Sequence, residues 1–299
     1  MKSLIEKLTE GKVLLSDGAW GTYLQEKGLI AGDCPELWNL NHYDDVLQIA
    51  KSYIDAGSDI IQTNSFGGSK IKLSNYGLEE NCYEINKSAG EISREAAGYD
   101  KFVIGSMGPT GKFLMMAEVS EEELYDSYAI QAKGLEDGGV DACCIETFYD
   151  IDEAIIAVNA VNDKTNLEII LTFTFEKKLE GMFNTIMGIT PEQYVNLIDL
   201  EKVDVIGSNC GNGFLDMIDV VTKIKNSSKD KYIIVHANAG IPEIKENKIL
   251  YPDTPDRMSD FATPLIKAGA DIIGGCCGTT PAHIRALREI VDEINRNRN

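Results

Sequence analysis

Three cysteines in glycine-rich surroundings carry the clearest chemistry of this sequence. Cys276 and Cys277 are adjacent in segment 274–280, whose glycines let the backbone turn sharply enough to aim both thiols at one point. Cys210 lies in a similar segment, 206–213, where an apolar run also passes into Asn and Gly. Three thiolates with one vacant position match a catalytic zinc, because a structural zinc uses four protein ligands. The cysteines therefore predict an open zinc site; the alternative for the adjacent pair is burial as small apolar side chains on a core strand.

A zinc ion held by three thiolates suits thiol chemistry. The zinc together with its three thiolates carries a net negative charge, and such a zinc is a poorer Lewis acid than one held by histidines. Activation of water for hydrolysis is therefore disfavoured. A substrate thiol in the open position would lose its proton to become a reactive thiolate at neutral pH. Such a thiolate can attack an electrophilic carbon, for example a methyl group.

The remaining cysteines and one histidine are predicted to be structural. Cys143 and Cys144 are also adjacent, but no glycine flanks them, so we expect both to pack in the core. Cys34 and Cys82 have the same interpretation. His236 stands inside an apolar run, and we expect it in the protein interior near the metal ligands; ligation of the metal by His236 is the alternative.

Eight short apolar runs, rich in β-branched residues, recur along the 299 residues. Each is followed by Gly, Asn, Ser or Thr and then by a helical pattern, as expected of βα units. Eight strands alternating with helices predict an α/β fold, a single (β/α)8 TIM-type barrel domain over residues 1–299. A doubly wound sheet is the alternative, but it predicts fewer strands and an early glycine-rich phosphate loop. The predicted strands are 13–16, 59–62, 102–105, 142–145, 169–172, 203–206, 232–235 and 271–274.

Capping signals mark helices between these strands. Segment 45–56 has apolar residues at helical spacing and stops at Gly57. Ser120 followed by Glu123 predicts a capping box, and Thr190 followed by Pro191 predicts a second helix start. Several joints between a helix and the next strand share one form, a Gly that stops the helix and an Asp that opens the strand. These joints are 56–60, 137–142 and 268–272.

In such a barrel the reactive groups lie on the loops after the strands. Asp17 and Glu146 follow the first and fourth strands, and either carboxylate could hold an ammonium group. A turn or helix cap is the alternative for Asp17, and a solvated loop charge for Glu146. Backbone amides near these positions could hold a carboxylate, so the loops at this end of the barrel would bind an amino acid that carries a thiol. The predicted substrate-binding residues are Asp17, Gly18, Ala19, Ser106, Glu146 and Asn209.

Composition excludes several classes of function. The formal net charge is −20 and no basic block occurs, which argues against nucleic-acid binding. No apolar run approaches the length that spans a bilayer, and the first residues lack the features of a signal peptide and predict a helix instead. Seven cysteines without an export signal indicate reduced thiols. We therefore expect a cytoplasmic protein that binds neither nucleic acid nor membrane.

The sequence resembles the homocysteine S-methyltransferase family along essentially its whole length. This resemblance implies that Cys210, Cys276 and Cys277 bind zinc, that the sulfur of homocysteine completes the shell, and that Asp17 and Glu146 hold the amine of homocysteine. The resemblance therefore implies methylation of homocysteine to methionine. The motifs that carry it are 17–22, 62–66, 105–111, 145–147, 208–211 and 274–281.

The resemblance is strongest to the homocysteine-binding module of cobalamin-dependent methionine synthases. Because the sequence stops where that module ends, a separate methyl-corrinoid protein is the expected donor. The alternatives are a small donor such as S-methylmethionine or betaine, or a zinc- or thiol-binding module that is inactive by itself. Segment 32–36 lacks the Trp with which betaine enzymes of the family cage the donor, which argues against betaine. Tyr251 is expected to line the mouth; an aldolase is disfavoured because no strand end carries a lysine.

Overall fold

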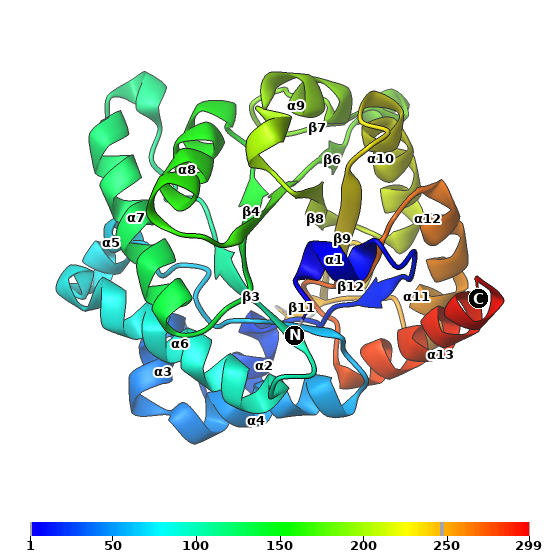
Figure 1. The fold of residues 1–299 in the computed structure, drawn as a ribbon, viewed down its shortest axis with the longest axis horizontal. Coiled ribbons are helices and arrows are strands. Elements are labelled where there is room, and N and C mark those ends of the chain that lie inside the picture. The colour runs from blue at the N-terminus through cyan, green and yellow to red at the C-terminus, as the bar shows by residue number, and fades with distance from the viewer. Residues whose placement is uncertain (1, 246–247, 299) are drawn as a thin grey trace.

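The computed structural model describes residues 2–245 and 248–298. Eight parallel strands form one sheet that curls into a nearly closed barrel inside a ring of helices (Figure 1). Every predicted strand overlaps one of these eight, so the (β/α)8 prediction is confirmed; that residues 1–299 form one domain stays a prediction. In their order around the sheet, the strands are β1 (Leu14–Leu15), β12 (Ile272–Gly275), β9 (Tyr232–Asn238), β8 (Val205–Gly213), β5 (Glu168–Phe173), β4 (Ala142–Phe148), β3 (Phe102–Met107) and β2 (Ile60–Gln62).

Helices follow the strands as the capping signals predict. Capping boxes at Ser120 and Thr190 start α7 and α9, and the predicted helix 45–56 is α4. Among the described residues, no helix is long and apolar enough to cross a membrane. The helices are α1 (Leu4–Leu8), α2 (Gly21–Glu26), α3 (Trp38–Asn41), α4 (Tyr43–Asp55), α5 (Lys70–Leu73), α6 (Cys82–Ala97), α7 (Glu121–Asp137), α8 (Ile151–Lys164), α9 (Pro191–Leu197), α10 (Phe214–Ser227), α11 (Pro255–Asp260), α12 (Ala262–Ala268) and α13 (Pro281–Asn297).

The apolar core has two layers, one inside the barrel and one between the strands and the helices. Leu4 and Leu8 of α1 pack with the inward-facing strand residues, so α1 closes one end of the barrel, the near end in Figure 1. Cys144 belongs to this inner cluster, whereas Cys143 belongs to the outer one, as alternation along a strand requires. Both thiols are fully buried, and burial raises the pKa of each. Their prediction as core residues is confirmed.

Between β1 and β2 a backbone hydrogen bond and a side-chain hydrogen bond, both at Asp59, take the place of a strand ladder. β1 and β2 stand at opposite ends of the sheet order. The amide of Asp59 donates to the carbonyl of Leu15 at 2.7 Å, and the amide of Leu15 donates to the Asp59 carboxylate at 3.0 Å. The same pair of bonds recurs at the other joints that open a strand with Asp, at Asp141, Asp204 and Asp271. The repeated Asp thus ties each such strand to its neighbour.

Two β-hairpins and a short 3-10 helix extend the loops at the end of the barrel opposite α1. β6 (Glu176–Lys177) pairs with β7 (Phe183–Asn184) after β5, and β10 (Glu243–Lys245) pairs with β11 (Lys248–Leu250) after β9. The 3-10 helix Leu114–Met116 follows β3. None of these was predicted from the sequence.

Candidate functional site

The three predicted metal-binding cysteines meet at the carboxyl end of the barrel. The Cys210 and Cys277 sulfurs are 3.9 Å apart, those of Cys276 and Cys277 are 4.0 Å apart, and all three lie within 4.8 Å of one another. Zn–S bonds of about 2.3 Å at tetrahedral angles would place the sulfurs about 3.8 Å apart. The spacing of the thiols therefore fits a zinc ion. Hydrogen bonds from the other two thiols lower the pKa of Cys277.

Local backbone geometry turns Cys210 toward the other two cysteines. The register of β8 with β9 breaks between Asn209 and Gly213. Within this break Cys210 has φ 58° and Gly211 has φ 69°, both in the left-handed region. Left-handed backbone is costly for a cysteine, and at Cys210 it accompanies the placement of the sulfur beside those of Cys276 and Cys277.

The Cys276–Cys277 turn is fixed by β9 and by the loop that follows β11. The Cys276 amide donates to the carbonyl of Ala237 at 2.7 Å, and the carbonyl of Cys277 accepts from Ala239 at 3.0 Å. Gly278 follows at φ 79°, and a Cβ there would overlap the ring of Tyr251. Tyr251 thus packs against the residue that follows Cys277; that it lines the mouth stays a prediction.

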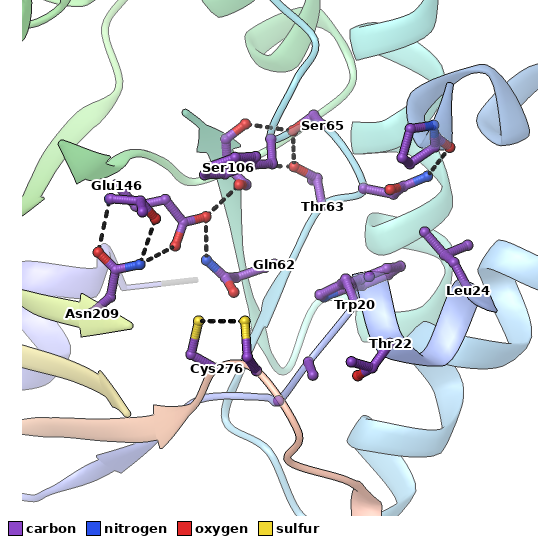
Figure 2. Close-up of a pocket in the computed structure, with 18 of the residues that line it drawn as sticks. Trp20, Thr22, Leu24, Gln62, Thr63, Ser65, Ser106, Glu146, Asn209 and Cys276 are labelled. Atoms are coloured by element: carbon purple, nitrogen blue, oxygen red, sulfur yellow. Dashed lines mark hydrogen bonds between the residues drawn. The ribbon is translucent and has the colours of Figure 1, made fainter. Parts of the chain in front are cut away.

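The three cysteines line a cavity of about 280 Å³. Glu146, at the end of β4, lies on the cavity wall and is nearly completely buried. Its carboxylate accepts hydrogen bonds from Ser106 Oγ, from Gln62 Nε2 at 3.0 Å and from Asn209 Nδ2 at 3.5 Å (Figure 2). Burial raises the pKa of Glu146, while the bonds from Ser106 and Gln62 oppose this shift. Within the described chain no Lys or Arg pairs with Glu146, so the carboxylate can receive a ligand cation.

Asp17 lies behind the cavity wall rather than on it. Its carboxylate is fully buried. It accepts hydrogen bonds from Trp20 Nε1 at 2.8 Å, from the backbone N–H of Gln62 at 2.9 Å and from Ser16 Oγ at 3.2 Å. Burial raises the pKa of Asp17 to about 7. The Asp17 side chain thus joins the ends of β1 and β2 and holds Trp20 and Gln62, which do line the cavity.

The backbone amides predicted to hold a carboxylate are mostly engaged within the protein. The Ala19 amide donates to Thr279 Oγ1 and the Ser106 amide to Thr63 Oγ1, each at 3.0 Å. Gly18, Ala19, Ser106 and Asn209 all line the cavity as predicted. Ser106 and Asn209 contribute their side chains to the Glu146 network, a role that the sequence did not indicate.

The other candidate residues are not members of the thiol cluster. His236 is buried inside the barrel, neither ring nitrogen has a partner in the described structure, and burial lowers its pKa to about 4. The cluster of potential metal ligands found among the described residues contains the three thiols and not His236. Cys34 and Cys82 are buried, with pKa values raised to about 12 by burial, in agreement with a structural role.

Sequence reasoning missed Gln62 as a site residue. Gln62 lies two positions after Ile60, which faces the barrel interior, so its side chain also points inward. It therefore meets Glu146 across β3, and Figure 2 shows its amide pointing toward that carboxylate. Strand alternation was the available signal. Trp20 and Phe66, which also line the cavity, were noted only as parts of motifs.

Fold and site together define a TIM-type barrel protein with a three-thiol cluster and a buried carboxylate in one cavity. A model of the homocysteine S-methyltransferase family matches residues 14–291, and the chain belongs to this family. It is 29% identical over 307 residues to the methionine synthase of Mycobacterium tuberculosis and 28% identical over 306 residues to that of Mycobacterium leprae. Each match covers 98% of this chain but only 26% and 25% of those proteins, so the chain spans about a quarter of their length.

A solved structure shows the same fold. The homocysteine methyltransferase MmuM from Escherichia coli, in its metallated form, superposes with a TM-score of 0.78 over 95% of this chain and 98% of that one, at 22% sequence identity. The family match and the homology to methionine synthases support a methyltransferase.

Proposed function

We propose that this protein is a zinc-dependent methyltransferase that methylates the thiol of homocysteine to give methionine. One observation carries the proposal: a thiol cluster with the spacing of zinc ligands and a buried carboxylate without a cationic partner in the described chain share one cavity of about 280 Å³. Such a cavity offers one place for a sulfur and another for an ammonium group. The methionine synthases among its relatives support this choice of substrate.

Each end of the substrate has a proposed partner. Cys210, Cys276 and Cys277 would hold zinc, which would bind the substrate sulfur and favour its thiolate form. Glu146 would hold the ammonium group, because one of its oxygens already accepts from Ser106 and Gln62 and the other accepts only a long bond. Asp17 would act indirectly, by fixing Gln62.

The chain's residues prepare the substrate for attack. Glu146 orients the amino acid so that its sulfur faces the mouth, and the apolar wall that includes Trp20 and Phe66 limits access of water. The thiol proton leaves to solvent, and the sulfur then displaces the donor's leaving group from the methyl carbon. We further propose that the methyl group comes from a separate methyl-corrinoid protein; S-methylmethionine and betaine are the alternatives to test.

Metal analysis tests the site. We expect about one zinc per chain in the wild-type protein and loss of zinc in Cys210→Ala, Cys276→Ala and Cys277→Ala. Cys143→Ala is the matched control, because Cys143 is adjacent to another cysteine but lies in the core. Full zinc content in Cys277→Ala would contradict the site.

A methionine-formation assay tests the reaction. The zinc-loaded protein and homocysteine are incubated with a methylated corrinoid protein, S-methylmethionine or betaine, and methionine is measured. Methionine from one donor identifies it. Binding of zinc and homocysteine without methionine from any donor would instead favour a binding module.

A further inference from the structure

Two residues at the site have a backbone conformation that side chains disfavour. Thr147, near the end of β4, has φ 64°, and Cys210, near the end of β8, has φ 58°. Among the described residues, Ala117 is the one other non-glycine residue with positive φ. The left-handed region is uncommon for any residue with a side chain, and a β-branched residue such as Thr147 is an outlier there. Strained backbone of this kind persists where surrounding contacts hold it, and it clusters at functional sites.

The side chain of Asn209 connects these two strained residues. Asn209 directly precedes Cys210 on β8, and its amide reaches across β5 to β4. Its Oδ1 accepts from the backbone N–H of Thr147 at 2.8 Å and from Thr172 Oγ1, on β5, at 2.7 Å. Its Nδ2 donates to Thr147 Oγ1 at 2.7 Å and to Glu146 Oε2 at 3.5 Å. Figure 2 shows the Asn209 amide turned toward Glu146.

These four hydrogen bonds use the full capacity of the Asn209 side chain. A primary amide has two acceptor sites on its oxygen and two N–H groups on its nitrogen. Asn209 is also only 1% exposed, so water does not compete for its partners. A buried polar group whose bonds are all satisfied makes its surroundings rigid. The Asn209 side chain therefore fixes the end of β4 relative to the end of β8.

The two strand ends carry the two parts of the proposed substrate site. Glu146 directly precedes Thr147 on β4, and Cys210 directly follows Asn209 on β8. The Asn209 side chain thus ties the proposed ammonium site to the thiol cluster. A ligand held at both ends must span the separation between these anchors, and only a fixed separation rejects a ligand of the wrong length. One missing methylene group in a closely fitting site weakens binding by about 10- to 200-fold.

We propose that Asn209, held by Thr147 and Thr172, is a positioning residue that fixes the separation between Glu146 and the thiol cluster and thereby selects the substrate by chain length. Selection favours homocysteine over cysteine, which is one methylene group shorter. The proposal rests on the proposed function and deepens it, because it names the residues that make the site specific for one aminothiol. Thr172 is not among the residues that line the cavity, so its effect on ligand choice reaches the ligand through Asn209.

Isosteric variants of the two threonines test the proposal. Thr172→Val removes the hydroxyl that donates to Asn209, and Thr147→Val removes the hydroxyl that accepts from it, while both keep the shape of the side chain. Thr172→Ser keeps the hydroxyl and is the conservative variant. Thr165→Val is the matched control, because Thr165 is half-buried like Thr147 and its hydroxyl donates to the carbonyl of Val161 at 2.9 Å, at the carboxyl end of α8.

Calorimetry measures the dissociation constants of L-homocysteine and L-cysteine for each zinc-loaded protein, and urea unfolding shows that each variant is folded. We expect the wild type to bind homocysteine at least about tenfold more tightly than cysteine. This ratio should fall by about fivefold in Thr172→Val and Thr147→Val, because one hydrogen bond of the Asn209 side chain is lost. It should be unchanged in Thr172→Ser and Thr165→Val. A lower fraction of folded protein would not change the ratio.

Hydrogen exchange in the metal-free protein gives a second measurement, and the Thr147 amide should exchange faster in Thr172→Val than in the wild type. An unchanged binding ratio in both valine variants would overturn the positioning role. An equal fall in Thr165→Val would do the same, as would a wild type that binds both aminothiols equally. Selective homocysteine binding without methionine from any donor would overturn the proposed methyl transfer alone. Binding of neither aminothiol to the zinc-loaded wild type would overturn the proposed function and this inference together.

Discussion

Gln62 links the two buried carboxylates of the site. Its backbone N–H donates to the Asp17 carboxylate, and its side-chain Nε2 donates to the Glu146 carboxylate. Replacement by Leu removes a hydrogen bond to a carboxylate, an interaction worth about 1.5–3 kcal/mol. We therefore expect Gln62→Leu to lower kcat/KM for homocysteine by about 10- to 100-fold, with zinc content unchanged. Gln25→Leu, at an exposed position on α2, is the control, and equal kinetics of the two variants would contradict the role of Gln62.

Asp17 gives the protein a pH-dependent stability. Burial raises its pKa to about 7 in the folded state, whereas an unfolded Asp has a pKa of about 3.9. The stability contribution is thus fully present below pH of about 4 and is lost as the pH rises to about 7, by at most about 1.4 kcal/mol per pH unit.

Asp17→Asn tests this pH dependence because the amide fits the same partners. Its oxygen can accept from Trp20 and Gln62, and its NH₂ can donate to Ser16. We expect the free energy of unfolding of the wild type, relative to the variant, to fall between pH about 4 and 7 and to stay constant above. Urea unfolding at a series of pH values measures it, and a constant difference across that range would show that Asp17 is ionised throughout.

At the scale of elements, the end of β8 is shaped by two left-handed residues, Cys210 and Gly211. A Cβ on Gly211 would lie 2.6 Å from the carbonyl oxygen of Phe175, whereas one on Gly188, also at positive φ, would meet nothing within 4 Å. Both Gly→Ala changes cost about 1–2 kcal/mol for the left-handed backbone. Gly211→Ala should cost at least about 1 kcal/mol more and weaken zinc binding, whereas Gly188→Ala should leave zinc binding intact. Urea unfolding and zinc titration compare the two; equal effects would refute the steric argument.

The sequence predicts the strands and the difference between the two cysteine pairs better than it predicts the hydrogen-bond partners of the buried carboxylates. Apolar runs identified all eight barrel strands, and glycine context separated Cys276 and Cys277 from the core pair Cys143 and Cys144. The burial of Asp17 depends on neighbours contributed by another strand, which the local sequence does not encode. The β6–β7 and β10–β11 hairpins are too short to give a periodic pattern.

For the whole molecule, closure of the barrel at the seam between β1 and β2 involves two carboxylates in addition to the backbone bond from Asp59 to Leu15. Asp17 bridges the seam at its carboxyl end, and Asp59 bridges it at the other end through Leu15. Asp204 makes the equivalent bond between β5 and β8, but those strands also share a continuous ladder. The bond from a strand amide to an Asp carboxylate therefore contributes more to holding neighbouring strands together at Asp59 than at Asp204.

Asp59→Ala and Asp204→Ala should accordingly differ. Each leaves a strand amide without its carboxylate partner, a loss of about 1–3 kcal/mol. Asp59→Ala also removes the partner of Arg288 at 2.7 Å and of Lys101 at 3.3 Å, and no ladder holds the seam in its place. We expect a larger loss of unfolding free energy for Asp59→Ala, measured in urea, and faster hydrogen exchange at the amide of Leu15. Equal losses in the two variants, with Leu15 still protected, would mean that the packing of α1 and the helices closes the barrel without the seam carboxylate.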